Sequence, residues 1–418
     1  MAIGIEGAFL VFGGIIIIGY IGELFSKKFS IPSTIMLLLI GYLLKVSGYV
    51  DVADLTGLQS LFGTLALIIL LFDGGLTLNI LDVLFKSGRI FLMSILITVA
   101  SMFAAGFLMQ GFGFDFLIGA IVGAIAGGIG STTTISILKG LELPKDVGRF
   151  LTLESSITDI FSIILTIVLT QNLLSGFIDV QMIGQGILST FSVGTLVGIV
   201  GGILFISIFS RIEKGYSYMV MLGVILILYA LSEFFGGSGA IGVLIFSIML
   251  GNENLVRKII RIEEASERIF IREFHTEISF IIRTFFFVFL GIIVNFSNIN
   301  NFIIALGLVI SFLLIRYLIT KFVTRSSELS PYSNIITVIS PRGLATAVLA
   351  TYPLTTVQSY LQKAQVTNGQ DLISKLTNLP EIAFNIIILT IILTSILVPF
   401  VYKKQESKSE VKKQNKKK

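Results

Sequence analysis

The chain has 418 residues, of which 54% are apolar and only 13% are charged, and its formal net charge is +5. This balance is typical of a membrane protein, and apolar runs of about 20 residues recur along the whole length, each long enough to cross the hydrocarbon of a bilayer. A transmembrane barrel would instead show shorter segments of alternating polarity. The absence of cysteine excludes disulfides and thiolate metal sites.

The sequence also argues against enzyme chemistry. The single histidine, His275, lies in a charged segment and belongs to no HExxH pair, which argues against a zinc protease. Gly237-Ser238-Gly239 would need the same distant histidine to act as a serine protease. No nucleotide-binding motif is visible. We therefore expect no enzyme activity, no cofactor, and no nucleotide or nucleic-acid partner.

Apolar segments predict an all-α polytopic membrane protein with about thirteen transmembrane helices. The predicted spans are 4–25, 31–45, 57–79, 90–111, 115–137, 150–175, 183–209, 217–235, 238–251, 283–297, 301–323, 332–352 and 382–402.

Basic residues gather in alternate loops between these spans. The opposite loops hold only Lys45, Lys363 and Lys375, and a basic tail, 403–418, follows the last span. Loops rich in Lys and Arg stay in the cytoplasm. We therefore expect an extracellular N-terminus and a cytoplasmic C-terminus, which requires an odd number of spans. The tail is expected to be disordered, and the surrounding partner is membrane lipid.

Two predicted helices contain breaks. The fifth includes the glycine-rich run 123–130, followed by Ser131 and three threonines, and the twelfth includes Pro341-Arg342-Gly343. Glycine weakens a helix and proline removes a backbone donor. The glycine run alone equally fits close helix packing. Paired breaks in corresponding positions of two halves are typical of inverted-repeat transporters, whose site lies at the midplane.

The sixth predicted helix carries two carboxylates, Glu154 and Asp159, inside an apolar run. A carboxylate at the bilayer centre costs roughly 2.5–3.5 kcal/mol and usually marks an ion or proton path. Glu154 and Thr158 share one helical face, while Ser155 and Asp159 share another. One face can thus hold a structural charge pair while the other binds a small cation.

Four motifs occur in order along the chain: Leu71–Leu76 with Asp73, Glu154–Asp159, Arg283–Gly291 and Pro341–Gly343. Together they resemble those of monovalent cation:proton antiporters of the NhaP type, which are related to eukaryotic sodium/proton exchangers. The resemblance covers nearly the whole chain up to about residue 402.

The resemblance implies a homodimer in which a core moves relative to a dimerisation part. The dimerisation part would comprise 1–88 and 176–299, and the ion-translocating core 89–175 and 300–402. The fifth and twelfth helices would be the interrupted helices that cross in this core.

Two departures from the family pattern matter. Thr132-Thr133-Thr134 stands where the family has Thr-Asp-Pro, so Thr133 offers a hydroxyl but no charge to offset the helix ends. Thr158-Asp159 stands where the family has Asn-Asp. Family members with two acids at that place transport net charge, so the neutral Thr158 favours electroneutral exchange.

The resemblance assigns the shared cation and proton site to Asp159. Sodium prefers oxygen ligands, as other hard cations do, and the candidate ligands are Asp159, Ser155, Ser131 and Thr132. Because one carboxylate takes either a proton or a cation, competition would couple the two fluxes. Asp73 either contributes through water or caps its own helix locally.

Glu154 is expected to hold the broken helices together by pairing with a buried arginine. An acid–arginine pair costs far less in an apolar interior than either charge alone. We favour Arg342 as the partner, with Arg316 as the second choice. Arg283 is expected at the cytoplasmic end of the tenth helix.

The sequence thus predicts a secondary active antiporter in a prokaryotic cell membrane. It would exchange Na⁺ or Li⁺ for H⁺, serve pH homeostasis, and run on ion gradients alone. The alternatives are a K⁺/H⁺ antiporter on the same fold, and a cation channel or non-transporting sensor.

Overall fold

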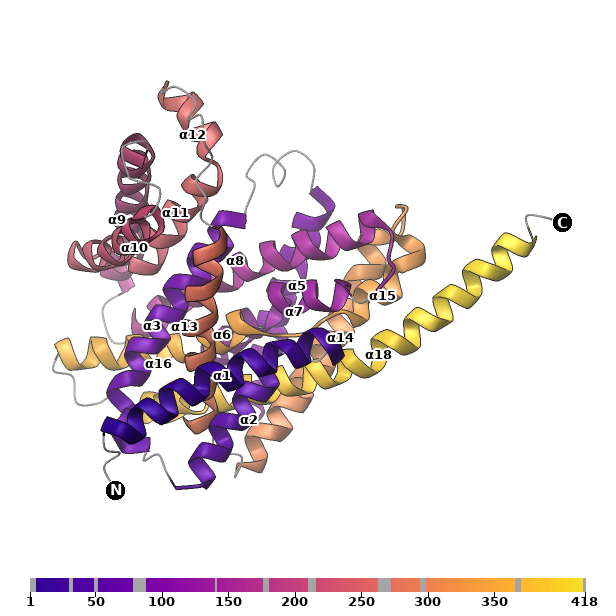
Figure 1. Ribbon diagram of the computed structural model, residues 1–418, viewed down its shortest axis with the longest axis horizontal. Coiled ribbons are helices and arrows are strands. Elements are labelled where there is room, and N and C mark those ends of the chain that lie inside the picture. Colours follow the sequence, from indigo (N-terminus) through magenta and orange to yellow (C-terminus); the bar gives the residue numbers. More distant parts are fainter. Residues whose placement is uncertain are drawn as a thin grey trace.

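The computed structural model describes residues 5–29, 33–48, 52–77, 88–139, 141–175, 180–209, 216–261, 272–293, 298–364 and 370–415. These residues form helices joined by short turns, and no strand occurs among them (Figure 1). The helices of the first half are α1 (Ile5–Phe29), α2 (Ser33–Val46), α3 (Val52–Thr77), α5 (Gly88–Gln110), α6 (Phe116–Gly127), α7 (Ser131–Lys139), α8 (Lys145–Ser175) and α9 (Val180–Ile208).

The second half begins with α10 (Ser217–Phe234), α11 (Gly239–Gly251), α12 (Glu253–Ile260), α13 (Arg272–Ile293) and α14 (Ile299–Thr324). A short 3-10 turn (Ser330–Tyr332) then leads to α15 (Ser333–Val338), α16 (Leu344–Ala364), α17 (Gln370–Thr377) and α18 (Leu379–Asn415).

Each predicted apolar segment coincides with one helix or with a broken pair. Within the described ranges, five helices are long and apolar enough to cross a membrane by length and composition, or six if α11 and α12, which bend by 85° at their junction, form one span. Shorter apolar helices account for most of the other segments. The chain is therefore a multi-pass helical membrane protein, and the number of full spans stays a prediction.

The predicted spans 115–137 and 332–352 are each interrupted, and both interruptions lie where glycine or proline occurs in the sequence. The chain leaves the helix at Gly127 and resumes it at Ser131, and it leaves again at Val338 and resumes at Leu344. Proline and glycine account for the second break, because Pro341 has no backbone donor and Gly343 loosens the turn.

The glycine-rich run serves packing as well as the break. A Cβ on Gly123 would come within 2.4 Å of the Ser101 carbonyl oxygen in α5, so only glycine allows α5 and α6 to approach this closely. The final glycines, at 128 and 130, lie in the break itself. Both interpretations of this run therefore apply, to different parts of it.

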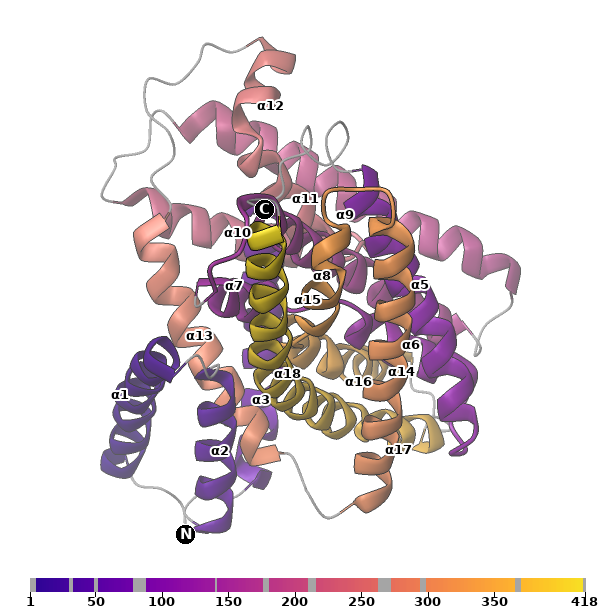
Figure 2. The same cartoon turned by 90° about the vertical axis from the view of Figure 1, so that its right-hand side faces the viewer.

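The helices gather into two groups. Helices α5, α6, α8, α14, α15, α16 and α18 pack on one another, whereas α2, α3 and α13, together with α9, α10 and α11, form the second group (Figures 1 and 2). The groups touch mainly where α3 contacts α8 and α16. Figure 2 shows α1, α2 and α13 on one side of the molecule and α5, α6 and α14 on the other.

Two expectations, one about a helix boundary and one about the C-terminal tail, were wrong. Helix α13 begins at Arg272, so Arg283 lies within it and not at its end. The tail was expected to be disordered, but α18, which contains Pro399, continues as a helix to Asn415. The last part of α18 projects away from the other helices (Figure 1).

Candidate ion-binding site

Asp159 lies on α8 beside the first helix break. Its side chain is only 7% exposed, and its Oδ2 accepts a hydrogen bond from the Ser131 backbone N–H at 3.3 Å. The Ser131 hydroxyl also lies within hydrogen-bonding reach of this carboxylate. Ser131 is the first residue of α7, and the N-terminus of a helix attracts negative charge. The broken helix therefore supports the buried carboxylate with backbone dipoles.

Thr158, the residue before Asp159, also contacts the first helix break. Its Oγ1 accepts a hydrogen bond from the Ile129 N–H at 3.3 Å and donates to the Ser155 carbonyl at 3.1 Å. Thr158 is fully buried. Its hydroxyl is thus engaged in fixing the backbone between α6 and α7.

The two breaks contact each other directly. The Gly130 N–H donates to the Pro341 carbonyl oxygen at 2.8 Å, which joins segments more than two hundred residues apart. A Cβ on Gly130 would lie 2.9 Å from the Gly343 nitrogen, and one on Gly343 would lie 2.9 Å from the Thr133 Oγ1. Thr133 therefore sits beside the start of α16 and presents a neutral hydroxyl there.

Arg342 binds the backbone carbonyls at the end of α6. Its Nε donates to the Ala126 carbonyl at 2.7 Å and its Nη1 donates to the Ser340 carbonyl at 2.6 Å. The last carbonyls of a helix lack intrahelical partners and carry partial negative charge. The guanidinium of Arg342 also lies 5.6 Å from the centroid of the Phe312 ring.

Glu154 pairs with Arg316, not with the expected Arg342. Arg316 on α14 donates through Nη1 to Glu154 Oε1 at 2.5 Å and through Nη2 to Oε2 at 3.0 Å. Its guanidinium also binds the carbonyl of Ile336, near the end of α15, at 2.9 Å. Arg342 is already engaged with α6, so the favoured partner was wrong and the second choice is the one observed.

Among the predicted ligands, the structure shows Ser131 in contact with Asp159 and places the others as follows. Ser155 lies one turn before Asp159 on α8, is fully buried, and donates its hydroxyl to the Thr152 carbonyl at 2.9 Å, which leaves its oxygen lone pairs available. Thr132 lies in α7, but its side chain is outside the described residues. Asp73 lies on α3 within electrostatic range of Tyr218 on α10, and its contribution to the site stays a prediction.

Several partners in this region were not foreseen. Thr390 on α18 accepts a hydrogen bond from the Arg342 N–H at 3.1 Å, and the remaining partners of the two arginines are backbone carbonyls of α6, of α15 and of Ser340 in the second break. A threonine within an apolar helix was the available signal for Thr390. Backbone carbonyls leave no signal in the residue types.

A buried carboxylate at the contact of two interrupted helices defines a class of protein: helical membrane transporters with a central ion site. The chain belongs to the transmembrane sodium/hydrogen exchanger family, whose model matches residues 13–403. This family consists of cation:proton antiporters and is not a class of enzymes.

Relatives of both ion preferences are similar to the chain. The K⁺/H⁺ antiporter NhaP2 of Shewanella sp. (strain MR-4) is 30% identical over 241 residues, which cover 54% of this chain and 41% of the relative. The chain thus matches less than half the length of such relatives. A probable Na⁺/H⁺ antiporter 2 of Methanocaldococcus jannaschii is 25% identical over 379 residues, covering 83% of this chain and 86% of the relative.

A solved structure supports the same fold. The sodium proton antiporter MjNhaP1 from Methanocaldococcus jannaschii, determined at pH 8, superposes with a TM-score of 0.73 at 21% identity. The match covers 94% of this chain and 99% of the other. The helical arrangement described above is therefore that of a known antiporter fold.

Proposed function

We propose that this protein is a secondary antiporter that exchanges Na⁺ or Li⁺ for H⁺ across the cell membrane by competition at Asp159. The observation that carries the proposal is the buried Asp159 carboxylate, supported by the Ser131 N–H at a helix break. A buried acid that forms no salt bridge within the described residues can accept a proton or a cation in turn.

The oxygen atoms around Asp159 suit a small alkali cation. The carboxylate, the hydroxyl of Ser131 and the hydroxyl of Ser155 are oxygen donors from α7 and α8, and Thr132 is a further candidate. Hard cations prefer such ligands. The positive end of α7 opposes the simultaneous binding of a cation and a proton, because one carboxylate cannot offset all three positive charges.

Exchange is proposed to be electroneutral, one cation for one proton. Glu154 is engaged by both nitrogen atoms of the Arg316 fork and is fully buried, so it holds its charge as part of the scaffold. Thr158, beside Asp159, has no charge to contribute. A single carboxylate then carries all the transported charge.

The proposed architecture is an inverted repeat of about thirteen spans with two crossing, interrupted helices, α6–α7 and α15–α16. The two arginines support this symmetry, since Arg342 donates a hydrogen bond to a carbonyl at the end of α6 and Arg316 donates one to a carbonyl near the end of α15. The two helix groups support a translocating core of 89–175 and 300–402 and a dimerisation part of 1–88 and 176–299. The homodimer, the extracellular N-terminus and the cytoplasmic C-terminus belong to the same proposal.

A second candidate is K⁺/H⁺ antiport. Relatives named K⁺/H⁺ antiporters are 30% identical to the chain over about half of its length. The same oxygen ligands serve either ion, because selectivity among hard cations depends on cavity size and ligand flexibility. The two candidates share Asp159 as the site and differ only in the ion.

Proteoliposomes with a trapped pH dye test both candidates. We expect Na⁺, Li⁺ or K⁺ added to one side to dissipate a pH gradient, and competition between the ions to identify the preferred one. Asp159→Asn should abolish exchange, while Asp371→Asn, which alters an exposed acid on α17, should leave it intact. Full exchange in Asp159→Asn would overturn the proposal. Cation current independent of the pH gradient would identify a channel instead.

A further inference from the structure

A pocket of about 820 Å³ lies at the ends of three core helices, away from Asp159. It opens between the start of α5, the start of α8 and the segment that joins α14 to α15. Its floor is apolar and is formed by Ile90, Phe150, Leu153 and Leu329. A volume of this size is typical of sites for small organic ligands.

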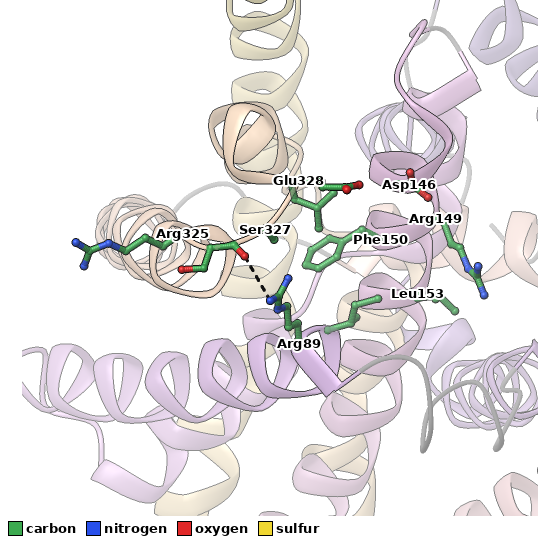
Figure 3. A pocket seen from close by; sticks show the side chains of 11 residues that line it. Arg89, Asp146, Arg149, Phe150, Leu153, Arg325, Ser327 and Glu328 are labelled. Atoms are coloured by element: carbon green, nitrogen blue, oxygen red, sulfur yellow. Dashed lines mark hydrogen bonds between the residues drawn. The ribbon is translucent and has the colours of Figure 1, made fainter.

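Charged side chains of both signs surround the floor. Arg89, Asp146 and Glu328 line the pocket together with Arg149 and Arg325. In Figure 3, Arg89 reaches toward the middle of the pocket, the carboxylates of Asp146 and Glu328 lie on the same side of Phe150, and the other two arginines point away.

These charges do not neutralise one another. Within the described residues none of these five side chains forms a salt bridge. The only hydrogen bond that any of the five makes there is a long one, 3.4 Å, from Arg89 Nη2 to the Ser326 carbonyl. A ligand that fits this arrangement carries an anion for Arg89 and a cation for Asp146 and Glu328. A guanidinium fork matches a phosphate, and two carboxylates match a primary ammonium.

The last two turns of α14, which precede the segment that lines the pocket, carry exposed apolar side chains. Phe322 and Leu318 lie three and seven residues before Arg325 and are 71% and 58% exposed. Acyl chains attached to a bound headgroup would lie along this surface. The proposed orientation places the pocket at the cytoplasmic end of the spans, at the depth of lipid headgroups.

We propose that this pocket binds a phosphoethanolamine group, with the phosphate on Arg89 and the ammonium on Asp146 and Glu328. The group belongs either to a phosphatidylethanolamine lipid or to a free soluble phosphoethanolamine, and the exposed apolar surface favours the lipid. Because the ligand would contact α5, α8 and the link to α15, it would brace the end of the helix that carries Asp159.

The test measures binding to the full-length protein in detergent, so its result does not depend on transport. Native mass spectrometry and thermal melting are recorded with phosphatidylethanolamine, phosphatidylcholine, phosphatidylglycerol and soluble phosphoethanolamine. For the wild-type protein we expect phosphatidylethanolamine to bind at least about tenfold more tightly than phosphatidylglycerol, which lacks the ammonium group. Phosphatidylcholine, whose cation has no N–H donors, should fall between them.

Charge variants separate the two halves of the site. Arg89→Gln should weaken every phospholipid, whereas the double variant Asp146→Asn with Glu328→Gln should weaken phosphatidylethanolamine alone and remove the preference over phosphatidylglycerol. Lys258→Gln, on exposed α12, is the matched control and should change nothing.

Each outcome bears on the proposal. Equal binding of phosphatidylethanolamine and phosphatidylglycerol by the wild-type protein overturns it without any variant. A preference that survives the double variant overturns the assignment to this pocket. Tight binding of soluble phosphoethanolamine supports the site and identifies a soluble source, whereas binding of the lipid alone identifies the membrane.

Discussion

Glu154 and Arg316 form a bidentate ion pair with both side chains essentially buried, at 0% and 1% exposure. The pair joins α8, which carries Asp159, to α14, and through the Ile336 carbonyl it also reaches the end of α15. Such a pair costs desolvation energy, and its role is to fix one arrangement of the three helices.

Breaking this pair on one side is expected to destabilise the protein strongly. Glu154→Gln or Arg316→Met should each cost about 3–5 kcal/mol, because each leaves a buried charge without its partner. The double variant should recover part of this loss, since no unpaired charge remains. Thermal or denaturant unfolding in detergent checks the cycle, and strictly additive losses would contradict the coupling. Arg257→Gln, at a second ion pair in which Arg257 is buried and Glu253 is partly exposed, tests whether the effect is specific to the core.

Gly130→Ala is expected to abolish exchange while leaving the protein inserted in the membrane. The new Cβ would lie 2.9 Å from the Gly343 nitrogen, and its three nearest neighbours are all backbone atoms that cannot rotate away. The two breaks would have to separate, which would move the Ser131 N–H away from Asp159. The dye assay in proteoliposomes measures the loss. Gly223→Ala in α10, where no atom lies within 4 Å of the new Cβ, should be fully active. Normal exchange by Gly130→Ala would show that close contact of the breaks is unnecessary.

Thr133→Asp is expected to shift the pH dependence of exchange. The new carboxylate would lie beside the start of α16 and close to the site, where it makes loss of the transported proton harder. The pH of half-maximal exchange should rise by about one unit. Thr133→Asn has nearly the same shape without the charge and should keep the original profile. An identical shift in both variants would trace the effect to packing.

Membrane potential is expected not to drive turnover. A potential of 100 mV is worth about 2.3 kcal/mol for each net charge moved, so a one-to-one exchange should feel none of it. Exchange rates in proteoliposomes clamped with valinomycin at different K⁺ gradients check this, with Na⁺ as the transported ion. A rate that follows the imposed potential would mean that a second acid titrates during transport, with Asp73 and Glu154 as the candidates.

Much of the helical plan could be predicted from the sequence, because membrane hydrocarbon demands long apolar helices and tolerates few breaks. The breaks at residues 128–130 and 339–343 lie where glycine and proline indicated them. Arg283 was misplaced because the apolar run begins after it, whereas the helix itself begins at Arg272. Hydropathy locates the apolar part of a helix and not its polar extension.

The partner of Glu154 could not be predicted from sequence alone. Arg316 and Arg342 both lie in apolar segments, so composition favours neither of them as the partner of Glu154. The two arginines differ in the helix end that each one contacts: Arg342 binds the carbonyl of Ala126 and Arg316 binds the carbonyl of Ile336. These carbonyls are chemically identical to every other backbone carbonyl, so the sequence does not mark them. Only the packing of the four helices reveals the assignment.

The hydrogen bond from the Gly130 N–H to the Pro341 carbonyl has a practical consequence for mutagenesis. Both of its atoms are main-chain atoms, so truncating side chains leaves this tether intact. An alanine scan across the region would therefore report little at most positions and would suggest, wrongly, that the halves of the molecule are joined only by charged groups. Substitutions that add side-chain volume at the contact between the two breaks are therefore needed to test this hydrogen bond.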